Sequence, residues 1–348
     1  MDIFLKILSG IILLFSLIPL VRHNHWSFRI FEFPRIQKWT INLIIAIAYI
    51  FFLDISSSLD WLFIFLLTVN FIYLSFQIFP YLVIAPKQIQ TAKKQEKVTI
   101  NLLIANVYQD NQQFEKLIDL VKEIKADIVL LVETNQVWKE KCLQGFGDKY
   151  NYQIIEEREN TYGMMIFSKF KLENSEVRHL IKAEIPSITT DVILSNNRKI
   201  KFYALHPEPP VPKENPNSTD RDAEILMIGK EAAKEELPII VAGDLNDVAW
   251  SYTSNLFQKI SGLLDPRRGR GLFSSFHANY PLFRWPLDHI FCSGHFRVKK
   301  MKRLKSIGSD HFPILISLHL HAIEDDSEEF EVDHSDKVKA AEKIEAAK

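Results

Sequence analysis

The sequence predicts an α/β catalytic domain that follows a membrane-embedded leader. Three observations indicate this: apolar stretches dominate the first 86 residues, strands and amphipathic helices alternate from residue 98 onward, and short polar motifs stand where apolar runs end. Continuous apolar strands are expected when a sheet is covered on both faces. Because ligands bind beyond the carboxyl ends of such strands, the polar motifs mark a candidate active site.

Three apolar stretches occupy the leader, residues 1–86: Ile3–Val21, Trp39–Leu53 and Trp61–Ala85. A helix needs roughly 20 residues to cross a bilayer, so the third is long enough. The second is a span only if it continues through Asp54 to the serines at 56–58. The first lacks a clear cleavage site, so we interpret it as an uncleaved helix. We therefore expect two to three transmembrane helices.

Basic residues predict how the leader is oriented. The link between the second and third stretches, Asp54–Asp60, has none, whereas both outer flanks of this helix pair are basic: Arg22, Arg29, Arg35 and Lys38 on one side, and Lys87, Lys93, Lys94 and Lys97 on the other. Short basic loops stay in the cytoplasm. The sequence therefore predicts an integral membrane protein with a cytoplasmic catalytic domain.

The remaining boundaries follow from composition. Residues 87–97 are polar and rich in Lys and Gln, as expected of a linker, and residues 98–322 form the catalytic domain. Residues 323–348 are acidic and then rich in Ala, Lys and Glu, which predicts a disordered tail that forms at most a marginal helix. No function is assigned to this tail.

A strand, helix, strand unit opens the catalytic domain. The extended run 98–105 ends at Asn106, apolar residues recur at helical spacing over 114–124, and the apolar run 128–132 ends at Glu133. The carboxyl ends of neighbouring parallel strands share one edge of a sheet. We therefore expect Asn106 and Glu133 to meet there.

The same arrangement recurs in the second half of the domain. The run 199–205 ends in His206, and 238–242 ends in Gly243-Asp244-Leu245-Asn246. Asp288 stands at the head of another apolar run, and Asp310-His311 precedes the strand 314–320. Alternate residues of an extended segment face the same side, so Asp244 and Asn246 are expected to converge on one phosphate.

This residue set suits hydrolysis of a phosphoester, which requires a divalent cation, an activated water and a partner for the leaving oxygen. Mg²⁺ prefers oxygen ligands, which dispersed Asp, Glu and Asn side chains supply. The two cysteines, Cys142 and Cys292, lie far apart, which argues against a zinc site or a disulfide framework. The net charge of −1 excludes a global basic field for gripping nucleic acid.

These motifs together resemble the endonuclease/exonuclease/phosphatase superfamily. The resemblance rests on Gly-Asp-Leu-Asn at 243–246 and Ser-Asp-His-Phe-Pro at 309–313, with four further residues in the right order: Asn106, Glu133, His206 and Asp288. It covers about residues 98–321. It implies a four-layer sandwich of two mixed β-sheets flanked by helices. The leader further resembles a bacterial membrane-anchored branch, which implies the bacterial inner membrane.

The resemblance also implies roles for individual residues. Glu133 would hold Mg²⁺ or Mn²⁺, with Asn106 and Asp310 nearby. Asp244 would orient or deprotonate the attacking water, and Asn246 would hold a phosphate oxygen. The remaining roles fall to three residues: His311 at the scissile phosphate, Asp288 fixing the tautomer of His311, and His206 near the phosphate and leaving group. His289 is expected to face away from the site.

A basic stretch lies between the last two motifs. Arg267, Arg268 and Arg270 form a glycine-spaced cluster that suits bidentate recognition of phosphate. Two interpretations stay open: the cluster binds the non-reacting part of an anionic substrate, or it is a solvated basic face near anionic lipid. Arg221, after the proline-rich loop 207–216, is a weaker candidate for substrate binding.

The expected function is therefore a membrane-anchored, metal-dependent hydrolase of phosphodiester or phosphomonoester bonds. Its substrate is a phosphoester of one of three classes: nucleic acid, membrane lipid or a soluble phosphate. No protein partner is predicted. The alternative is a catalytically inactive relative that binds phosphate or nucleic acid at the membrane.

Overall fold

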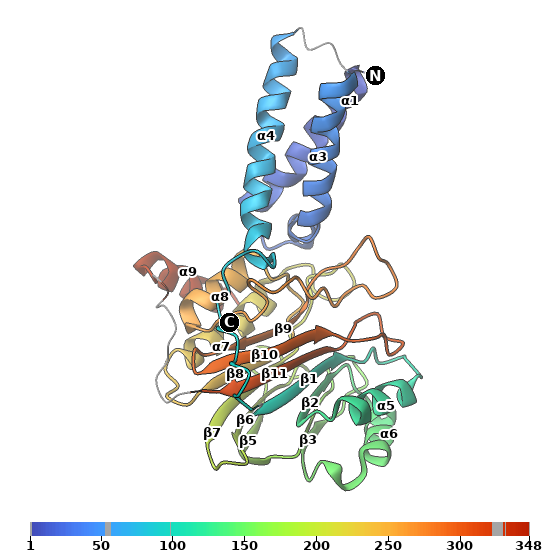
Figure 1. Cartoon of the computed structure of the whole chain (residues 1–348), viewed down its shortest axis with the longest axis vertical. Helices are drawn as coiled ribbons and strands as arrows, with labels where there is room; N and C mark the ends of the chain where they lie inside the picture. Colours follow the sequence, from blue (N-terminus) through green and yellow to red (C-terminus); the bar gives the residue numbers. More distant parts are fainter. Residues whose placement is uncertain (1, 53–56, 98, 322–329, 331, 348) are drawn as a thin grey trace.

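The computed structural model describes residues 2–52, 57–97, 99–321, 330 and 332–347. Three N-terminal helices form a bundle above the catalytic domain (Figure 1): α1 (Asp2–Leu17), α3 (Arg35–Phe52) and α4 (Ser58–Ile78). Two segments in the described part of the chain, Asp2–Val21 and Ser58–Tyr81, are long and apolar enough to cross a membrane. Any continuation of the second apolar stretch into 53–56 lies outside the described residues.

The bundle is apolar outside and partly polar inside. Exposed side chains on its surface include Ile7, Leu14, Ile44, Phe65 and Phe76. Between the helices, the buried Asn70 Nδ2 donates to Asn42 Oδ1 over 2.9 Å, and Trp39 Nε1 donates to Ser75 Oγ over 2.8 Å. Interhelical polar contacts surrounded by apolar surface are typical of helices that associate in lipid.

Short segments at the base of the bundle contact the catalytic domain. They comprise α2 (Trp26–Arg29) and three 3₁₀ turns, η1 (Ile18–Val21), η2 (Ile30–Glu32) and η3 (Phe79–Tyr81). Trp250 Nε1 donates to the Glu32 carbonyl over 2.8 Å, and Tyr81 Oη donates to the Ala249 carbonyl over 2.7 Å. Both contacts reach the loop that follows the Gly-Asp-Leu-Asn motif. The base of the bundle is therefore joined to the active-site side of the domain.

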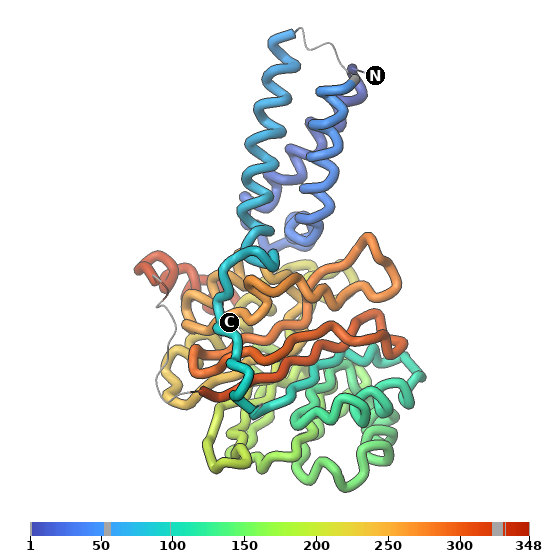
Figure 2. The backbone as a smooth tube through the Cα atoms, viewed as in Figure 1, coloured from blue at the N-terminus to red at the C-terminus, as the bar shows by residue number. Residues whose placement is uncertain are grey.

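The linker over 87–97 lies against the catalytic domain. After α4 the chain descends along the domain to the first strand of the sheet (Figure 2). Ala92 N donates to the Val298 carbonyl over 3.0 Å, and Glu96 forms an ion pair with Arg297. Ile89 is buried in the core of the domain. The segment therefore extends the sheet edge and is not a free tether.

Two mixed sheets form the catalytic domain (Figure 1). The first has the order β10-β11-β1-β2-β4-β3, with bounds β10 (Phe296–Arg303), β11 (Ile314–Leu320), β1 (Ile100–Asn106), β2 (Ile128–Val132), β4 (Met164–Ser168) and β3 (Tyr152–Glu156). The second has the order β5-β6-β7-β8-β9, with bounds β5 (Lys171–Arg178), β6 (Ser187–Ile193), β7 (Lys199–Leu205), β8 (Ile239–Asp244) and β9 (Asp288–Cys292). Strands β1 and β2 pair in parallel, as do β7 and β8, and the other pairs are antiparallel.

Apolar side chains from both sheets form one shared core, to which Leu102, Leu130, Phe202 and Ile240 belong. Helices cover the outer faces: α5 (Phe114–Ile124) and α6 (Gln136–Phe146), followed by the turn η4 (Gly147–Lys149), on the first sheet, and α7 (Thr219–Ala232), α8 (Tyr252–Ser261) and α9 (His334–Glu345) on the second. This architecture confirms the predicted sandwich of two mixed sheets flanked by helices.

The prediction of a disordered tail over 323–348 is wrong for residues 334–345. They form α9, which Asp333 caps by accepting from Asp336 N. Ala340 and Ile344 are buried against α7 and α8, and Lys343 forms an ion pair with Asp222 over 2.7 Å. Two apolar residues one helical turn apart suffice to dock a short helix, which the overall composition of the tail conceals. The acidic run 322–329 lies outside the described residues.

Candidate active site

The polar motifs of both sheets meet at one edge of the sandwich. Asn106 is the last residue of β1, Glu133 follows β2, and Asp244 is the last residue of β8 in the other sheet. Asn106 Nδ2 donates to Glu133 Oε1 over 2.6 Å and to Asp244 Oδ2 over 3.0 Å. A single amide therefore links the ends of the two sheets. The predicted meeting of Asn106 with Glu133 is present in the structure.

An Asp, His, Asp group adjoins this amide. Asp244 and Asp288 are register partners of antiparallel β8 and β9, and His311 lies between their carboxylates. His311 Nδ1 donates to Asp288 Oδ2 over 2.8 Å, and its Nε2 lies 3.5 Å from Asp244 Oδ2. All three side chains are buried. The Asp288 carboxylate is therefore in a position to fix the orientation of the ring, which is the role that the family resemblance implies.

The carboxylates set the charge of His311. Burial opposes charging of the ring, but Asp244 and Asp288 outweigh it and raise the pKa of His311 to about 10. Burial also raises the pKa of Asp288. The pKa of Asp244 is lowered despite burial, because His311 and the Asn106 amide favour its charged form. The group therefore presents a cationic ring beside an ionised Asp244.

His206 and Asn246 complete the site. His206 follows β7, is buried, and has a pKa lowered to about 4 by burial, so its ring is neutral. Its Nδ1 has no hydrogen-bond partner among the described residues. Asn246 is half-buried, and its Nδ2 donates to the Pro207 carbonyl over 2.9 Å. A neutral imidazole with a free nitrogen suits hydrogen bonding to a substrate oxygen.

Backbone geometry at the site is unusual. The backbone of Glu133 has φ +59° and that of Asn246 has φ +51°, values that residues other than glycine rarely adopt. Such strain persists where the surrounding structure fixes a functional geometry. Gly243 has φ +148°, and a Cβ there would lie 1.9 Å from the Leu205 carbonyl. Only glycine therefore lets β8 approach β7 closely enough to bring Asp244 beside His206.

Oxygen ligands suited to a divalent cation surround Asn106. Burial, together with the nearby Asp310 and Asp244 carboxylates, raises the pKa of Glu133 to about 7. Asp310 is half-buried and accepts from Ser309 Oγ over 3.4 Å. A cation placed beside Glu133 would favour its charged form and offset the burial and the neighbouring carboxylates that raise its pKa. Glu133, Asp310 and Asn106 therefore fit Mg²⁺ or Mn²⁺ by donor chemistry.

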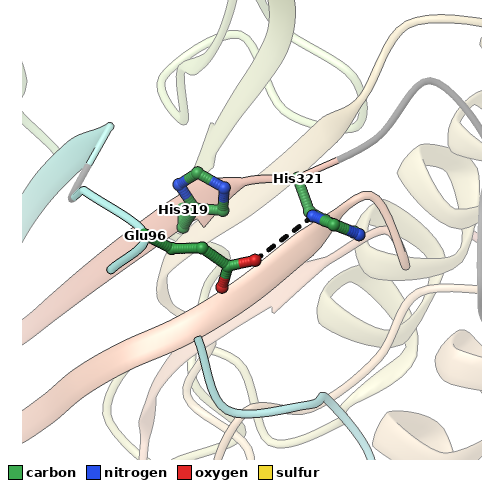
Figure 3. Close-up of side chains that lie close together, drawn as sticks. All are labelled: Glu96, His319 and His321. Carbon is green, nitrogen blue, oxygen red and sulfur yellow. Dashed lines mark ion pairs between the residues drawn. The ribbon is translucent and has the colours of Figure 1, made fainter. Parts of the chain in front are cut away.

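A second group of ligand-type side chains lies elsewhere. Glu96, His319 and His321 approach one another at the far end of β11 (Figure 3). Glu96 already accepts from Arg297 Nη1 over 2.8 Å, and His319 Nδ1 donates to the Lys97 carbonyl over 2.7 Å. This group is thus at the opposite end of the sheet from the catalytic motifs.

Several supporting residues have no recognisable signal in the sequence. Ser309 Oγ donates to the Asn106 carbonyl over 2.8 Å and accepts from His311 N, which ties β1 to the His311 motif. The Phe276 ring lies 4.9 Å from the His311 ring, between centroids. The Tyr162 ring lies 5.5 Å from that of His206. Of the residues named here, Ser309 does have a signal in the sequence, because it precedes Asp310-His311 in a recognisable motif. Phe276 and Tyr162 have none.

Arg221 does not meet the predicted role of a substrate ligand. It is buried and donates to Asp222 Oδ1 over 2.8 Å and to the Asn246 carbonyl over 2.7 Å. Asp222 also pairs with Arg29 of α2, at the base of the bundle, over 3.2 Å and with Lys343 of α9. Arg221 therefore positions the backbone of Asn246 and links it through Asp222 to the base of the bundle.

The predicted arginine cluster is likewise structural, and neither of its two interpretations holds for Arg267. Arg267 is fully buried, pairs with Asp265 over 2.8 Å and contacts His289 Nδ1 over 2.8 Å. Breaking a buried pair typically costs about 3–5 kcal/mol, so this arginine belongs to the core. Arg268 donates to Asn255 Oδ1, and Arg270 donates to the Ile89 carbonyl. The guanidinium groups of Arg268 and Arg270 therefore make these hydrogen bonds within the chain.

His289 faces away from the catalytic carboxylates, as expected. Its ring is buried, and burial with the nearby Arg267 lowers its pKa to about 3. His289 Nε2 donates to the Asp247 carbonyl over 2.8 Å. His289 and Arg221 therefore both hold the backbone of the loop that carries Asn246. The positions of the remaining predicted residues, from Asn106 to His311, agree with a single shared site.

Comparisons with known proteins agree with this geometry. Three solved structures resemble the chain: D. rerio TDP2 complexed with single strand DNA product (15% identity, TM-score 0.52, 63% of this chain and 98% of that one), an endonuclease/exonuclease/phosphatase family protein from Bacteroides thetaiotaomicron (18%, 0.53, 66% and 100%), and the human Nocturnin catalytic domain with bound sulfate anion (16%, 0.52, 64% and 94%). At these identities the likeness concerns the fold. No curated protein matches the sequence. The sequence profile of the Endonuclease/Exonuclease/phosphatase family matches residues 98–311, and the chain belongs to this family.

Proposed function

We propose that the chain is a membrane-anchored, divalent-metal-dependent hydrolase of phosphodiester or phosphomonoester bonds. Membership of a family that generally hydrolyses phosphoester bonds supports this proposal. The observation that carries it is the convergence of Asn106, Glu133, Asp244, Asp288 and His311 from two sheets onto one edge. An inactive relative would be expected to have lost at least one of these groups, and the chain retains all of them.

The side chains divide the chemical work. The ionised Asp244 accepts a hydrogen bond from the attacking water and directs it at the phosphorus. His311, held charged by Asp288, donates from Nε2 to a phosphoryl oxygen whose negative charge grows in the transition state. Asn246 and the neutral His206 hold the phosphate and the leaving oxygen. A cation held by Glu133, Asp310 and Asn106 would neutralise phosphoryl charge.

Hydrolysis assays on the purified full-length chain test this proposal. With Mg²⁺ present, we expect turnover of bis(p-nitrophenyl) phosphate, p-nitrophenyl phosphate, or both, and the ratio of the two rates reports the preference for diester or monoester. The His311→Ala variant is the control for contaminating phosphatases. Binding of these esters without turnover by the wild type would favour the inactive binding module instead.

The proposed anchor places the bundle in the bacterial inner membrane with the catalytic domain in the cytoplasm. Its exposed apolar surface and interhelical polar contacts support a location in lipid. The base of the bundle, next to the catalytic domain, carries Arg22, Arg29, Arg35 and Lys38. Because basic flanks stay in the cytoplasm, this end is expected to face inward.

A pair of reporter fusions in a bacterial host tests the orientation. Green fluorescent protein fused after Lys348 is expected to fluoresce, and alkaline phosphatase at the same site is expected to be inactive. Alkaline phosphatase fused after Ser56, which ends the chain between α3 and α4, is the matched control and is expected to be active. The reverse pattern would place the catalytic domain outside the cytoplasm.

A further inference from the structure

An apolar cleft of about 510 Å³ opens between the base of the bundle and the catalytic domain. Three segments line it: the juxtamembrane segment around α2, the loop after His206, and the loop before Asp288. The lining residues used below are Ile30, Phe33, Val211, Phe283 and Trp285. Its volume falls in the usual range of about 300–1,000 Å³ for ligand sites.

Two of the segments that line this cleft are connected to residues of the active site. Val211 belongs to the loop that begins with Pro207, whose carbonyl accepts from Asn246. On the opposite side, the Trp285 ring stacks on Phe276 with 6.1 Å between centroids, and Phe276 contacts the His311 ring. A row of packed aromatic rings, Trp285 and Phe276, therefore connects the wall of the cleft to His311.

The outer rim of the cleft continues toward the lipid-facing bundle. Ile30, Leu282 and Phe283 expose 52%, 78% and 56% of their surface. Gln37 Nε2, in the first turns of α3, donates to the Leu282 carbonyl over 2.7 Å. This pins the loop to the base of the bundle, toward which it rises in Figure 1 as the orange loop between α8 and β9. The open end of the cleft therefore lies at the membrane surface proposed above.

The side chains that line the cleft also indicate which class of ligand it binds. Arg29 is the charged residue that lines the cleft, and it is already paired with Asp222 and Glu32. The remaining lining side chains are apolar or aromatic, apart from the indole nitrogens. Such a cleft offers little to a polyanionic nucleic acid strand, which needs basic side chains along its backbone. It suits a hydrocarbon chain.

We propose that the cleft holds the hydrocarbon chain of a membrane lipid whose head-group phosphoester lies at His311 and Asp244. This inference rests on the proposed hydrolase function and narrows its substrate to amphiphilic phosphoesters. A lipid would enter from the bilayer past Leu282 and Phe283 and keep its apolar part out of water while the phosphate reaches the catalytic groups. Binding of the chain would then add to the affinity that the phosphate provides.

A series of alkyl p-nitrophenyl phosphates, from methyl to dodecyl, tests the proposal on the full-length chain below the micellar concentration of each ester. Burying one methylene is worth up to about fourfold in affinity. We therefore expect kcat/KM to rise with chain length until the cleft is filled, and then to level off. p-Nitrophenyl thymidine phosphate serves as the nucleotide probe. A rate for it far above that of the dodecyl ester would overturn the proposal.

Two variants test whether this cleft causes the dependence of kcat/KM on alkyl chain length. Val211→Glu and Phe283→Ser are each expected to flatten the dependence on chain length while the rate on the methyl ester changes by less than about threefold. Val338→Glu, at a valine that exposes 39% of its surface on α9, is the matched control and should retain the full dependence. Dependence on chain length that survives in both cleft variants would contradict the assignment of the chain to this cleft.

The outcomes separate this inference from the function on which it rests. Turnover of the methyl ester with equal rates for all chain lengths would refute the lipid cleft and leave the hydrolase intact. Turnover of none of the esters would refute the hydrolase, and the lipid substrate with it.

Discussion

Replacing Asp244 by asparagine is expected to lower kcat by about 10²–10⁴-fold, the usual worth of a positioned acid–base group. Asparagine keeps the size of the side chain and its hydrogen bond to Asn246 N. It removes the negative charge that orients water and balances His311, which lies 3.5 Å away. Steady-state kinetics on bis(p-nitrophenyl) phosphate measure the loss, and His311→Ala is expected to fall in the same range.

A matched substitution controls for lost stability. Asp191 is a buried carboxylate on β6 of the same sheet and pairs with Lys201 over 2.8 Å. Asp191→Asn should weaken folding while kcat of the folded protein stays within about threefold of the wild type. Near-normal turnover by Asp244→Asn would show that another group orients the water, and a common loss in both variants would point to damage of the sheet.

Sequence patterns predicted which side chains gather at the candidate site, because these residues stand where strands end. Asn106, Glu133 and Asp244 each follow an apolar run, and a cleft forms where the backbone leaves the core. The direct contact between Asn106 and Asp244 joins residues 138 positions apart. No local pattern encodes it, because it depends on how two sheets pack. The resemblance to a known family implied that these motifs share one site, but it did not predict this contact.

The polar strands of the second sheet were harder to predict. Strand β5 (Lys171–Arg178) is largely exposed, and an irregularity in its pairing with β6 separates Glu173 from Glu176. It therefore lacks both a continuous apolar run and a regular alternation. Edge strands of this kind are specified by their neighbours more than by their own residues.

The burial of Arg221 and Arg267, which were predicted to bind substrate, has one explanation. Arg221 is followed by Asp222, and Arg267 comes two residues after Asp265. Each arginine is neutralised by that neighbouring aspartate and buried with it. An arginine next to glycine suggests exposed phosphate recognition, but the adjacent aspartate was the signal of a buried pair. Both pairs support the loop after Asp244, so they still affect the site through its backbone.

The contacts between the base of the bundle and the catalytic domain give the proposed membrane anchor a structural consequence. Arg29, Asp222, Arg221 and the Asn246 carbonyl form one connected path from α2 to the catalytic loop. Trp250 and Tyr81 add two further links between the base of the bundle and the segment after Asn246. The helices therefore hold the orientation of the site as well as its location. In the proposed membrane anchor, this arrangement would place the open cleft beside lipid.

Removal of divalent cations is expected to abolish turnover, and Mg²⁺ or Mn²⁺ is expected to restore it. Glu133, Asp310 and Asn106 offer oxygen ligands at a point where burial, together with the Asp310 and Asp244 carboxylates, raises the pKa of Glu133 to about 7. Glu133→Gln removes one negative ligand, so we expect a large increase in the Mn²⁺ concentration at half-maximal rate. Electron paramagnetic resonance of Mn²⁺ measures binding independently of catalysis, and its affinity should fall in parallel.

Glu96→Gln provides the matched control, because Glu96 belongs to the other ligand-type group, with His319 and His321. This variant should keep the Mn²⁺ dependence of the wild-type rate. If Glu96→Gln shifted that dependence and Glu133→Gln did not, the catalytic cation would have to lie at the far end of β11, remote from His311. Full activity in excess chelator would contradict metal dependence itself. Asp244 and His311 would then have to stabilise the phosphoryl charge without the cation, and the crowded carboxylates around Asn106 would have no chemical purpose.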